Sequence, residues 1–144
     1  MPTPHLQQEI VELTQELIRI PSTHSRPQEI WNCAIFIEQW LQKNSIRYEL
    51  QESGGIPTIM VLPEKGSVPV LLMSHFDVIE ADDELIFIPR IDGDRLYGRG
   101  AIDDKYGVAL SLILYREHMR NRQAGGGDSR VPFGLLFTGD EEIG

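Results

Sequence analysis

Apolar residues recur with two different periods along this chain of 144 residues. In three segments they recur every three or four residues, which places them on one stripe of an α-helix. Other segments hold short runs of β-branched and aliphatic residues, as strands do. The predicted helices cover residues 4–20, a stretch that starts after residue 25, and 105–121, and the main predicted strands cover 46–51, 58–62, 68–73 and 131–138. Helices and strands in this alternation predict an α/β layered domain.

Three local signals add detail to this prediction. Ser25 and Gln28 have the spacing of a capping box at the start of the second helix. Residues 68–73 are almost continuously apolar, which predicts a strand buried on both faces. The triplet Asp92-Gly93-Asp94 predicts a hairpin turn, with residues 95–97 as the returning strand.

The composition argues against several classes of function. Asp and Glu number 22 against 13 Lys and Arg, so the formal net charge is −9 and nucleic acid is not an expected partner. The longest apolar runs are far too short to span a membrane, and the first residues do not resemble a signal peptide. Cys33 is the only cysteine, which excludes an internal disulfide and fits a cytoplasmic location. The excess of carboxylates serves either solubility or the binding of metal ions.

Three polar clusters follow strand-like segments. The first is Ser74-His75-Phe76-Asp77, the second is Gly98-Arg99-Gly100-Ala101-Ile102-Asp103-Asp104-Lys105, and the third is Thr138-Gly139-Asp140-Glu141-Glu142-Ile143-Gly144. Functional residues of open α/β sheets gather at the carboxyl ends of strands, so one sheet edge can bring these clusters together. A histidine with several carboxylates suits zinc or a pair of divalent cations.

Each cluster also has a plainer interpretation when it is taken alone. His75 can be a hydrogen-bonded surface histidine, and either Asp103 or Asp104 can cap the helix that follows. The third cluster can be a solvated acidic loop. Their joint occurrence favours a metal site over these alternatives.

The three motifs, in this order, resemble those of a co-catalytic zinc metallopeptidase family. This family includes acetylornithine deacetylase, succinyl-diaminopimelate desuccinylase, aminoacylase, carnosinase-like dipeptidases and glutamate carboxypeptidase. The resemblance includes Leu17-Ile18-Arg19-Ile20-Pro21-Ser22, so it spans essentially the whole chain. The loop at residues 85–90 matches the family pattern only in part.

The resemblance implies a role for each of five residues. His75 would bind the first metal, Glu142 would bind the second, and Asp103 would bridge the two. Glu141 would be the general base, and Asp77 would be the carboxylate that orients His75.

The resemblance also implies a fold, a cofactor and a substrate class. The expected fold is a three-layer α/β/α arrangement with a mixed, mostly parallel sheet, and the peptide bond between Asp103 and Asp104 is expected to be cis. Two Zn²⁺ ions occupy a complete site of this kind, with Co²⁺ or Mn²⁺ as substitutes, and the substrate is an N-acyl amino acid or a short peptide. Residues 1–144 would be the N-terminal portion of the catalytic domain, without its C-terminal part and without the dimerisation domain. The sequence does not indicate an oligomeric state.

Three functions follow as hypotheses. The first is a two-metal hydrolase of amide or peptide bonds, of which this chain carries part of the active site. The second is an inactive remnant or a binding fragment of such an enzyme, since each metal would have two protein ligands here where catalytic zinc has about three. The third is a small acidic interaction module, which requires the three clusters to lie far apart.

Overall fold

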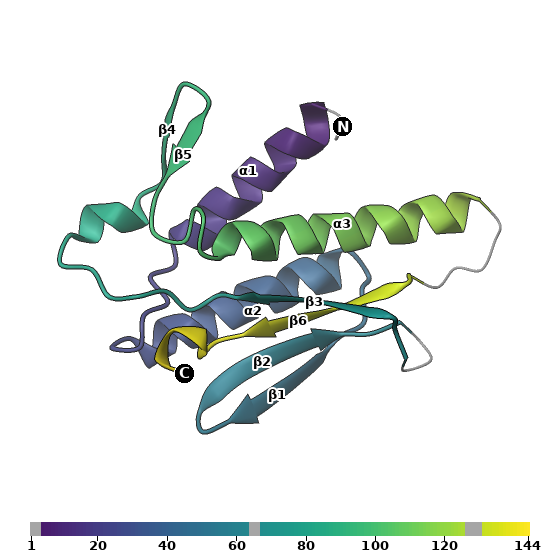
Figure 1. Ribbon diagram of the computed structural model, residues 1–144, viewed down its shortest axis with the longest axis horizontal. Coiled ribbons are helices and arrows are strands. Elements are labelled where there is room, and N and C mark those ends of the chain that lie inside the picture. The colour runs from purple at the N-terminus through teal and green to yellow at the C-terminus, as the bar shows by residue number, and fades with distance from the viewer. Residues whose placement is uncertain (1–3, 64–66, 126–130) are drawn as a thin grey trace.

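The computed structural model describes residues 4–63, 67–125 and 131–144, and Figure 1 shows their arrangement. In chain order the elements are α1 (Pro4–Ile18), α2 (Pro27–Lys43), β1 (Glu49–Ser53), β2 (Ile56–Val61), β3 (Val70–His75), the 3₁₀ turn η1 (Glu84–Phe87), β4 (Arg90–Asp92), β5 (Arg95–Tyr97), α3 (Lys105–Ala124), β6 (Phe133–Thr138) and the 3₁₀ turn η2 (Glu141–Ile143). The three helices and four main strands lie close to their predicted positions, so the α/β class is confirmed.

The main sheet is mixed, with the strand order β1-β2-β6-β3. Only the pairing of β3 with β6 is parallel, whereas β1 with β2 and β2 with β6 are antiparallel. The expectation of a mostly parallel sheet is therefore wrong for the described residues. The parallel pair is the one that matters for the site, because it brings the carboxyl ends of β3 and β6 to the same edge.

All three helices contribute to one core cluster together with one face of the sheet. The sheet residues of this cluster are Ile59 and Val61 of β2, which pair with Phe137 and Leu135 of β6. In Figure 1, α1 and α3 lie above the sheet, and α2 overlaps β3 and β6 in this view. The described residues thus form two layers, and a helical layer on the second face, which the three-layer expectation requires, is not among them.

Strand β3 is more exposed than its apolar sequence predicts. Val70 is 50% exposed and Met73 is 65% exposed. The reason is the position of β3 at the end of the strand order, with β6 as its neighbour on one side. The prediction of a strand buried on both faces is wrong for this part of the chain.

The start of α2 also differs from the prediction. The Ser25 backbone N–H and hydroxyl both donate to the Glu80 carboxylate, at 2.8 and 2.9 Å, and no side chain caps the helix. The capping-box prediction is wrong because the Ser25 hydroxyl donates to the distant carboxylate of Glu80 and not to the first turn of α2.

Helix α3 continues to Ala124, a few residues beyond its predicted end. Residues 126–130, which belong to the glycine-rich segment, lie outside the described residues.

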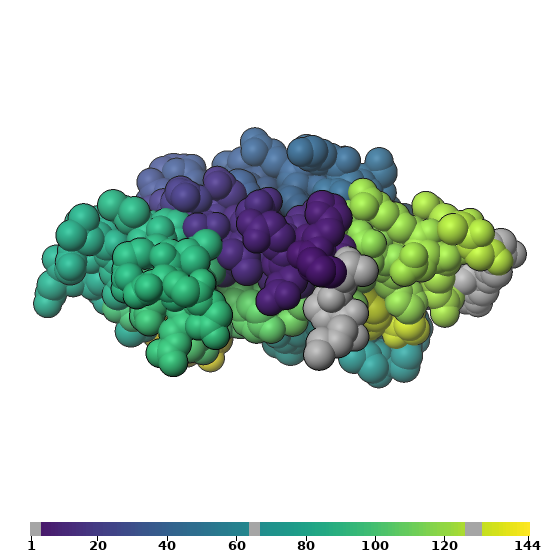
Figure 2. Space-filling view, turned by 90° about the horizontal axis from the view of Figure 1, so that it is seen from above, coloured from purple at the N-terminus to yellow at the C-terminus, as the bar shows by residue number. Residues whose placement is uncertain are grey.

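The predicted hairpin is confirmed. Strands β4 and β5 pair antiparallel, with Asp92 opposite Arg95, and Gly93 has the positive φ of 60° that such a turn requires. Figure 2 shows the segment around this hairpin, in teal and green, at one end of the molecule beside α1. No helix in the described part of the chain has both the length and the hydropathy needed to cross a bilayer.

A buried lysine joins α1 to the start of α3. Lys105 is fully buried, and its Nζ donates to the backbone oxygens of Leu17, at 2.7 Å, and of Ile20. These carbonyls lie at the C-terminal end of α1, where a helix lacks intrahelical donors and where the helix dipole favours a cation. Lys105 therefore fixes the turn that carries the second motif against α1.

We expect the Lys105→Met substitution to lower the free energy of unfolding by about 1–3 kcal/mol, because it leaves two buried carbonyls without a charged donor. Urea denaturation followed by circular dichroism measures the change. The control is Lys43→Met at the exposed end of α2, for which we expect a change within about 0.5 kcal/mol. Equal stabilities of the two variants would contradict this account of Lys105.

An ion pair between α1 and α3 makes the stability depend on pH. The Arg116 guanidinium, which is 5% exposed, donates to both oxygens of Glu9, and this hydrogen bond lowers the pKa of Glu9. A carboxyl whose pKa is lowered by folding contributes stability above its unfolded pKa of 4.5, and this contribution is lost as the pH falls through the lower folded value.

We therefore expect Glu9→Gln to cost about 1 kcal/mol of stability at pH 7 and progressively less as the pH falls below 4.5. Urea denaturation of the variant and of the unsubstituted chain between pH 7 and pH 3 measures the difference. Glu12→Gln, on an exposed position of the same helix, is the control. A cost that stays constant over this range would show that the charge of Glu9 is not involved.

Candidate metal centre

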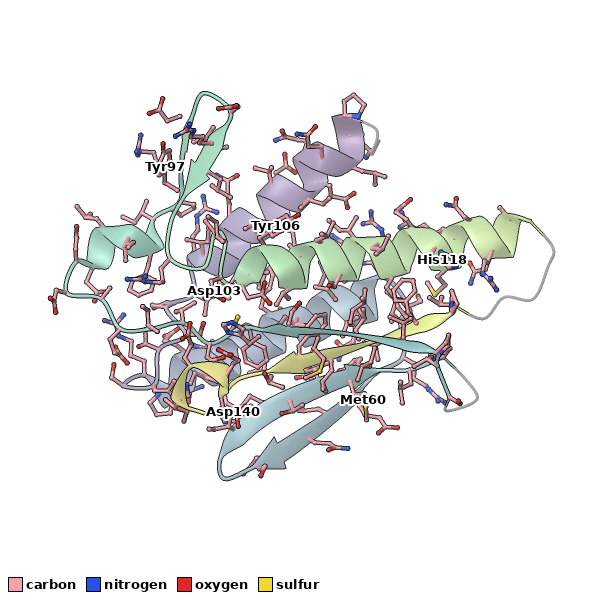
Figure 3. The ribbon with its side chains drawn as sticks, in the orientation of Figure 1. Met60, Tyr97, Asp103, Tyr106, His118 and Asp140 are labelled. Atoms are coloured by element: carbon pink, nitrogen blue, oxygen red, sulfur yellow. The ribbon has the colours of Figure 1, made fainter. Side chains whose placement is uncertain are left out.

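The structure brings the three polar clusters together at one edge of the sheet. The Nε2 atom of His75 lies 2.9 Å from Oδ1 of Asp103 and 3.7 Å from Oε2 of Glu141. One possible ligand atom each from His75, Asp103 and Glu142 lies within 4.8 Å of the others. Figure 3 shows Asp103 at the start of α3, beside the base of the hairpin that carries Tyr97. The interaction-module hypothesis required distant clusters, so this geometry counts against it.

The parallel pairing of β3 and β6 explains part of this convergence. His75 is paired with Thr138, so the first and third clusters leave the sheet at the same level. The second cluster reaches them through a turn that precedes α3. Gly100 in this turn has a φ of 88°, and the Asp103–Asp104 peptide bond is cis, as the resemblance implied.

Asp77 lies beneath the cluster and is fully buried. One of its oxygens accepts the backbone N–H of Glu142 at 2.9 Å, and the other accepts that of Glu141 at 3.2 Å. The same carboxylate lies 3.2 Å from Nδ1 of His75, a nitrogen that is also 3.1 Å from the Asp77 backbone oxygen. A single buried anion therefore orients both the imidazole and the backbone of the third motif.

The charges of the cluster shift two pKa values. Burial lowers the pKa of His75, but the hydrogen bond to Asp103 and the charge of Asp77 outweigh it, so the net pKa is raised. Burial raises the pKa of Glu142, the charge of His75 opposes this shift, and the negative charges of Asp103, Asp77 and Glu141 add to it, so the net pKa is raised. Carboxylates gathered in this way repel one another, and a bound cation relieves that repulsion.

Two residues of the site have roles that the sequence did not indicate. His24, in the loop before α2, places Nε2 2.9 Å from Oδ2 of Asp77 and is 22% exposed at its side chain. The one hint of this role in the sequence is that His24, one of four histidines, closely follows residues 17–22, which belong to the family resemblance. Asp104 does not cap α3 with its side chain, and instead accepts the backbone N–H of His75 at 3.3 Å. Gly107 is required beside it, since an added Cβ would lie 2.2 Å from Oδ1 of Asp104.

The donor set fits a zinc ion or a similar divalent cation. It combines an imidazole nitrogen with carboxylate oxygens, the ligands that zinc accepts beside thiolates. The side chain of Asp103 is 75% exposed and that of Glu141 is 61% exposed, so the outer side of the cluster is open to solvent. A small molecule can therefore reach the donors from outside.

Comparison with known proteins agrees with these motifs. The sequence model of the family described as "Peptidase family M20/M25/M40" matches residues 71–144, which contain all three clusters. A succinyl-diaminopimelate desuccinylase from Xylella fastidiosa is 30% identical over 139 residues, which cover 93% of this chain and 35% of the relative. An M20-domain protein from Schizosaccharomyces pombe is 29% identical over 140 residues, which cover 93% of this chain and 32% of the relative.

Solved structures show the same fold. Human carnosine dipeptidase 1 superposes with a TM-score of 0.70 and 25% identity, over 96% of this chain and 33% of the dipeptidase. An M20 family metallo-carboxypeptidase from Sulfolobus solfataricus superposes with a TM-score of 0.74 and 22% identity, over 94% of this chain and 31% of the carboxypeptidase. The chain spans about a third of the length of these relatives. With its family motifs in their expected order and its fold superposed on theirs, this chain belongs to the M20/M25/M40 peptidase family.

Proposed function

We propose that this chain forms part of the active site of a two-metal hydrolase that cleaves an amide or peptide bond of an N-acyl amino acid or a short peptide. The observation that carries the proposal is the approach of His75, Asp103 and Glu142 to within 4.8 Å, with Glu141 at their edge. The printed names of the relatives, a desuccinylase and a dipeptidase, support a small substrate with a C–N bond.

In this proposal the three donors would hold two divalent cations. His75 would be a ligand of the first, Glu142 would be a ligand of the second, and Asp103 would contribute to both. Zn²⁺ is the preferred ion, with Co²⁺ or Mn²⁺ as substitutes, and bound cations would supply the Lewis acidity that amide hydrolysis needs. Asp77 keeps the His75 ring in place through its Nδ1.

Glu141 carries the proton transfer in the same proposal. Its carboxylate is largely exposed and lies beside the donor cluster, with Oε2 3.7 Å from Nε2 of His75. It accepts a proton from the attacking water and passes that proton to the leaving nitrogen. Its backbone N–H is bound to Asp77, which sets the position from which the side chain acts.

The share of the relatives that the chain matches supports a further part of the proposal. In this proposal residues 1–144 are the N-terminal portion of a longer catalytic domain, which is consistent with their matching about a third of each relative. The described residues supply two ligands for each metal, one fewer than catalytic zinc usually has. We therefore expect the 144-residue chain by itself to bind zinc weakly and to have at most weak hydrolase activity.

The metal site is tested by calorimetric titration of the purified chain with Zn²⁺. We expect weak binding that falls at least about tenfold when His75→Ala and Asp103→Ala are combined, because two of the three donors are lost. Asp94→Ala, on the exposed turn of the hairpin, removes an acid of the same charge and is expected to leave the affinity unchanged. Identical isotherms for the double variant and the unsubstituted chain would remove the metal site from the proposal.

The role of Glu141 is tested in any protein that carries these residues and hydrolyses an N-acyl amino acid. We expect Glu141→Gln to lower kcat by about 10²–10⁴-fold, because an amide cannot accept the proton, and to change zinc affinity less than twofold. The matched control is Asp140→Asn, which changes the exposed acid next to it. A kcat that Glu141→Gln leaves intact would assign the proton transfer to another group.

A further inference from the structure

A cleft of about 300 Å³ opens beside the candidate metal centre. Asp103 and Glu142 line one part of it, so two of the three metal donors face this space. The rest of the wall comes from the end of β5, the turn before α3 and the segment after β3. The side chains that matter for binding are those of Ile79, Tyr97, Arg99 and Ile102.

Arg99 lacks an acceptor within the described part of the chain. Its Nε is buried and has no hydrogen-bond partner, and no carboxylate of the described residues forms an ion pair with its guanidinium. A buried donor without a partner is costly, and arginine in an acidic protein has many carboxylates to choose from. The described residues thus leave a cation unpaired in the cleft that holds the metal donors.

The backbone holds Arg99 at this place. Its N–H donates to the backbone oxygen of Ile86 at 2.8 Å. The next residue, Gly100, has a φ of 88°, and an added Cβ there would lie 2.9 Å from Cδ of the buried Lys105. The turn is therefore packed against the core, and the guanidinium starts from a fixed position rather than from a free loop.

The cleft offers a different surface to each part of a ligand. Asp103 and Glu142 are anionic and face the proposed cations, while Arg99 supplies a positive charge. Tyr97 is 40% exposed and Ile79 is 48% exposed, and they add an apolar surface. The guanidinium of Arg90, which is paired with Tyr97 across the hairpin, lies 4.5 Å from the centre of the Tyr97 ring and so helps to hold the ring in place.

We propose that Arg99 binds a carboxylate of the substrate in this cleft, while the substrate's apolar group lies against Tyr97 and Ile79. The planar guanidinium of Arg99, a residue that lines the cleft, can donate two parallel hydrogen bonds to a carboxylate, and this anion would balance the charge that no described residue pairs. The inference rests on the proposed function in one respect, that the amide beside this carboxylate is the reacting group. Arg99 is a specificity residue, and the binding it provides does not require a metal.

The carboxylate can lie on either side of the scissile amide, and three ligands distinguish the cases. N-acetyl-leucine carries it on the amine side, and N-butylsuccinamic acid carries it on the acyl side. N-acetyl-leucinamide has the apolar side chain of the first ligand but no carboxylate. Each is titrated into the ¹⁵N-labelled 144-residue chain without zinc, and the Nε–Hε signal of Arg99 is followed by NMR.

We expect at least one of the two acids to shift this signal saturably, and N-acetyl-leucinamide to leave it in place. For the acid that binds, we expect the Kd to be roughly tenfold to a hundredfold higher in Arg99→Gln, as measured from the chemical shifts of backbone amides. The increase should be smaller in Arg99→Lys, which keeps the positive charge but loses the planar guanidinium. Arg95→Gln on the exposed end of the same hairpin is the matched control and should keep the original Kd.

Either of two results would overturn the proposal: a Kd for the amide equal to those of the acids, or unchanged binding of the acid by a folded Arg99→Gln chain. The comparison of acid with amide uses the unsubstituted chain, so it decides the matter even where a variant does not fold. Zinc titration of the same samples separates the two proposals. Zinc binding without carboxylate binding refutes the role of Arg99 alone, and carboxylate binding without zinc binding refutes the metal site alone.

Discussion

The buried carboxylate of Asp77 is the constraint on which the candidate site depends. A carboxylate removed from water is stable only where polar groups surround it, and Asp77 has four such neighbours from three segments of the chain. The His24 imidazole and the backbone N–H groups of Glu141 and Glu142 are hydrogen-bonded to the carboxylate, and the His75 imidazole lies 3.2 Å from it. The anion thereby ties the loop before α2, the end of β3 and the start of η2 to one point. The exposed carboxylates of the candidate metal centre are therefore positioned in part by the contacts of the buried Asp77 carboxylate.

Charged side chains lie around this carboxylate both in the core and near the surface. Lys105 lies in the core, where burial lowers its pKa and the negative charge of Asp77 acts in the opposite direction. Nearer the surface, Asp103 and Glu142 add negative charge that a cation would balance. Arg99 stands at the side of the same cleft with a positive charge that the described residues leave unmatched. In the two proposals made above, the centre would bind two ligands of opposite charge, a metal cation and an organic anion.

The sequence could predict the elements, because these depend on local patterns. The helical period of α1 and the apolar run of β6 mark their own boundaries within a few residues. The meeting of the three motifs could be predicted because each follows a strand-like segment and because their order resembles that of a known family. Individual hydrogen bonds between other distant residues could not be predicted. Ser25 matched a local cap, but Glu80, 55 residues away, took its hydroxyl, and His24 meets Asp77 across 53 residues. The exposure of β3 could not be read from its sequence either, since an apolar run looks the same in the centre and at the edge of a sheet.

The register of β3 against β6 has a consequence for how this site tolerates change. His75 lies opposite Thr138, and Glu141 and Glu142 follow within the next four residues. A shift of one residue would move the strands by about 3.3 Å and turn each side chain of the shifted strand to the other face. Under the proposed function, sheet pairing and metal affinity would both depend on this alignment. Zinc affinity would then be sensitive to changes in the hydrophobic core far from the donors, and a substitution that preserves stability but changes the strand alignment would first cause a loss of metal.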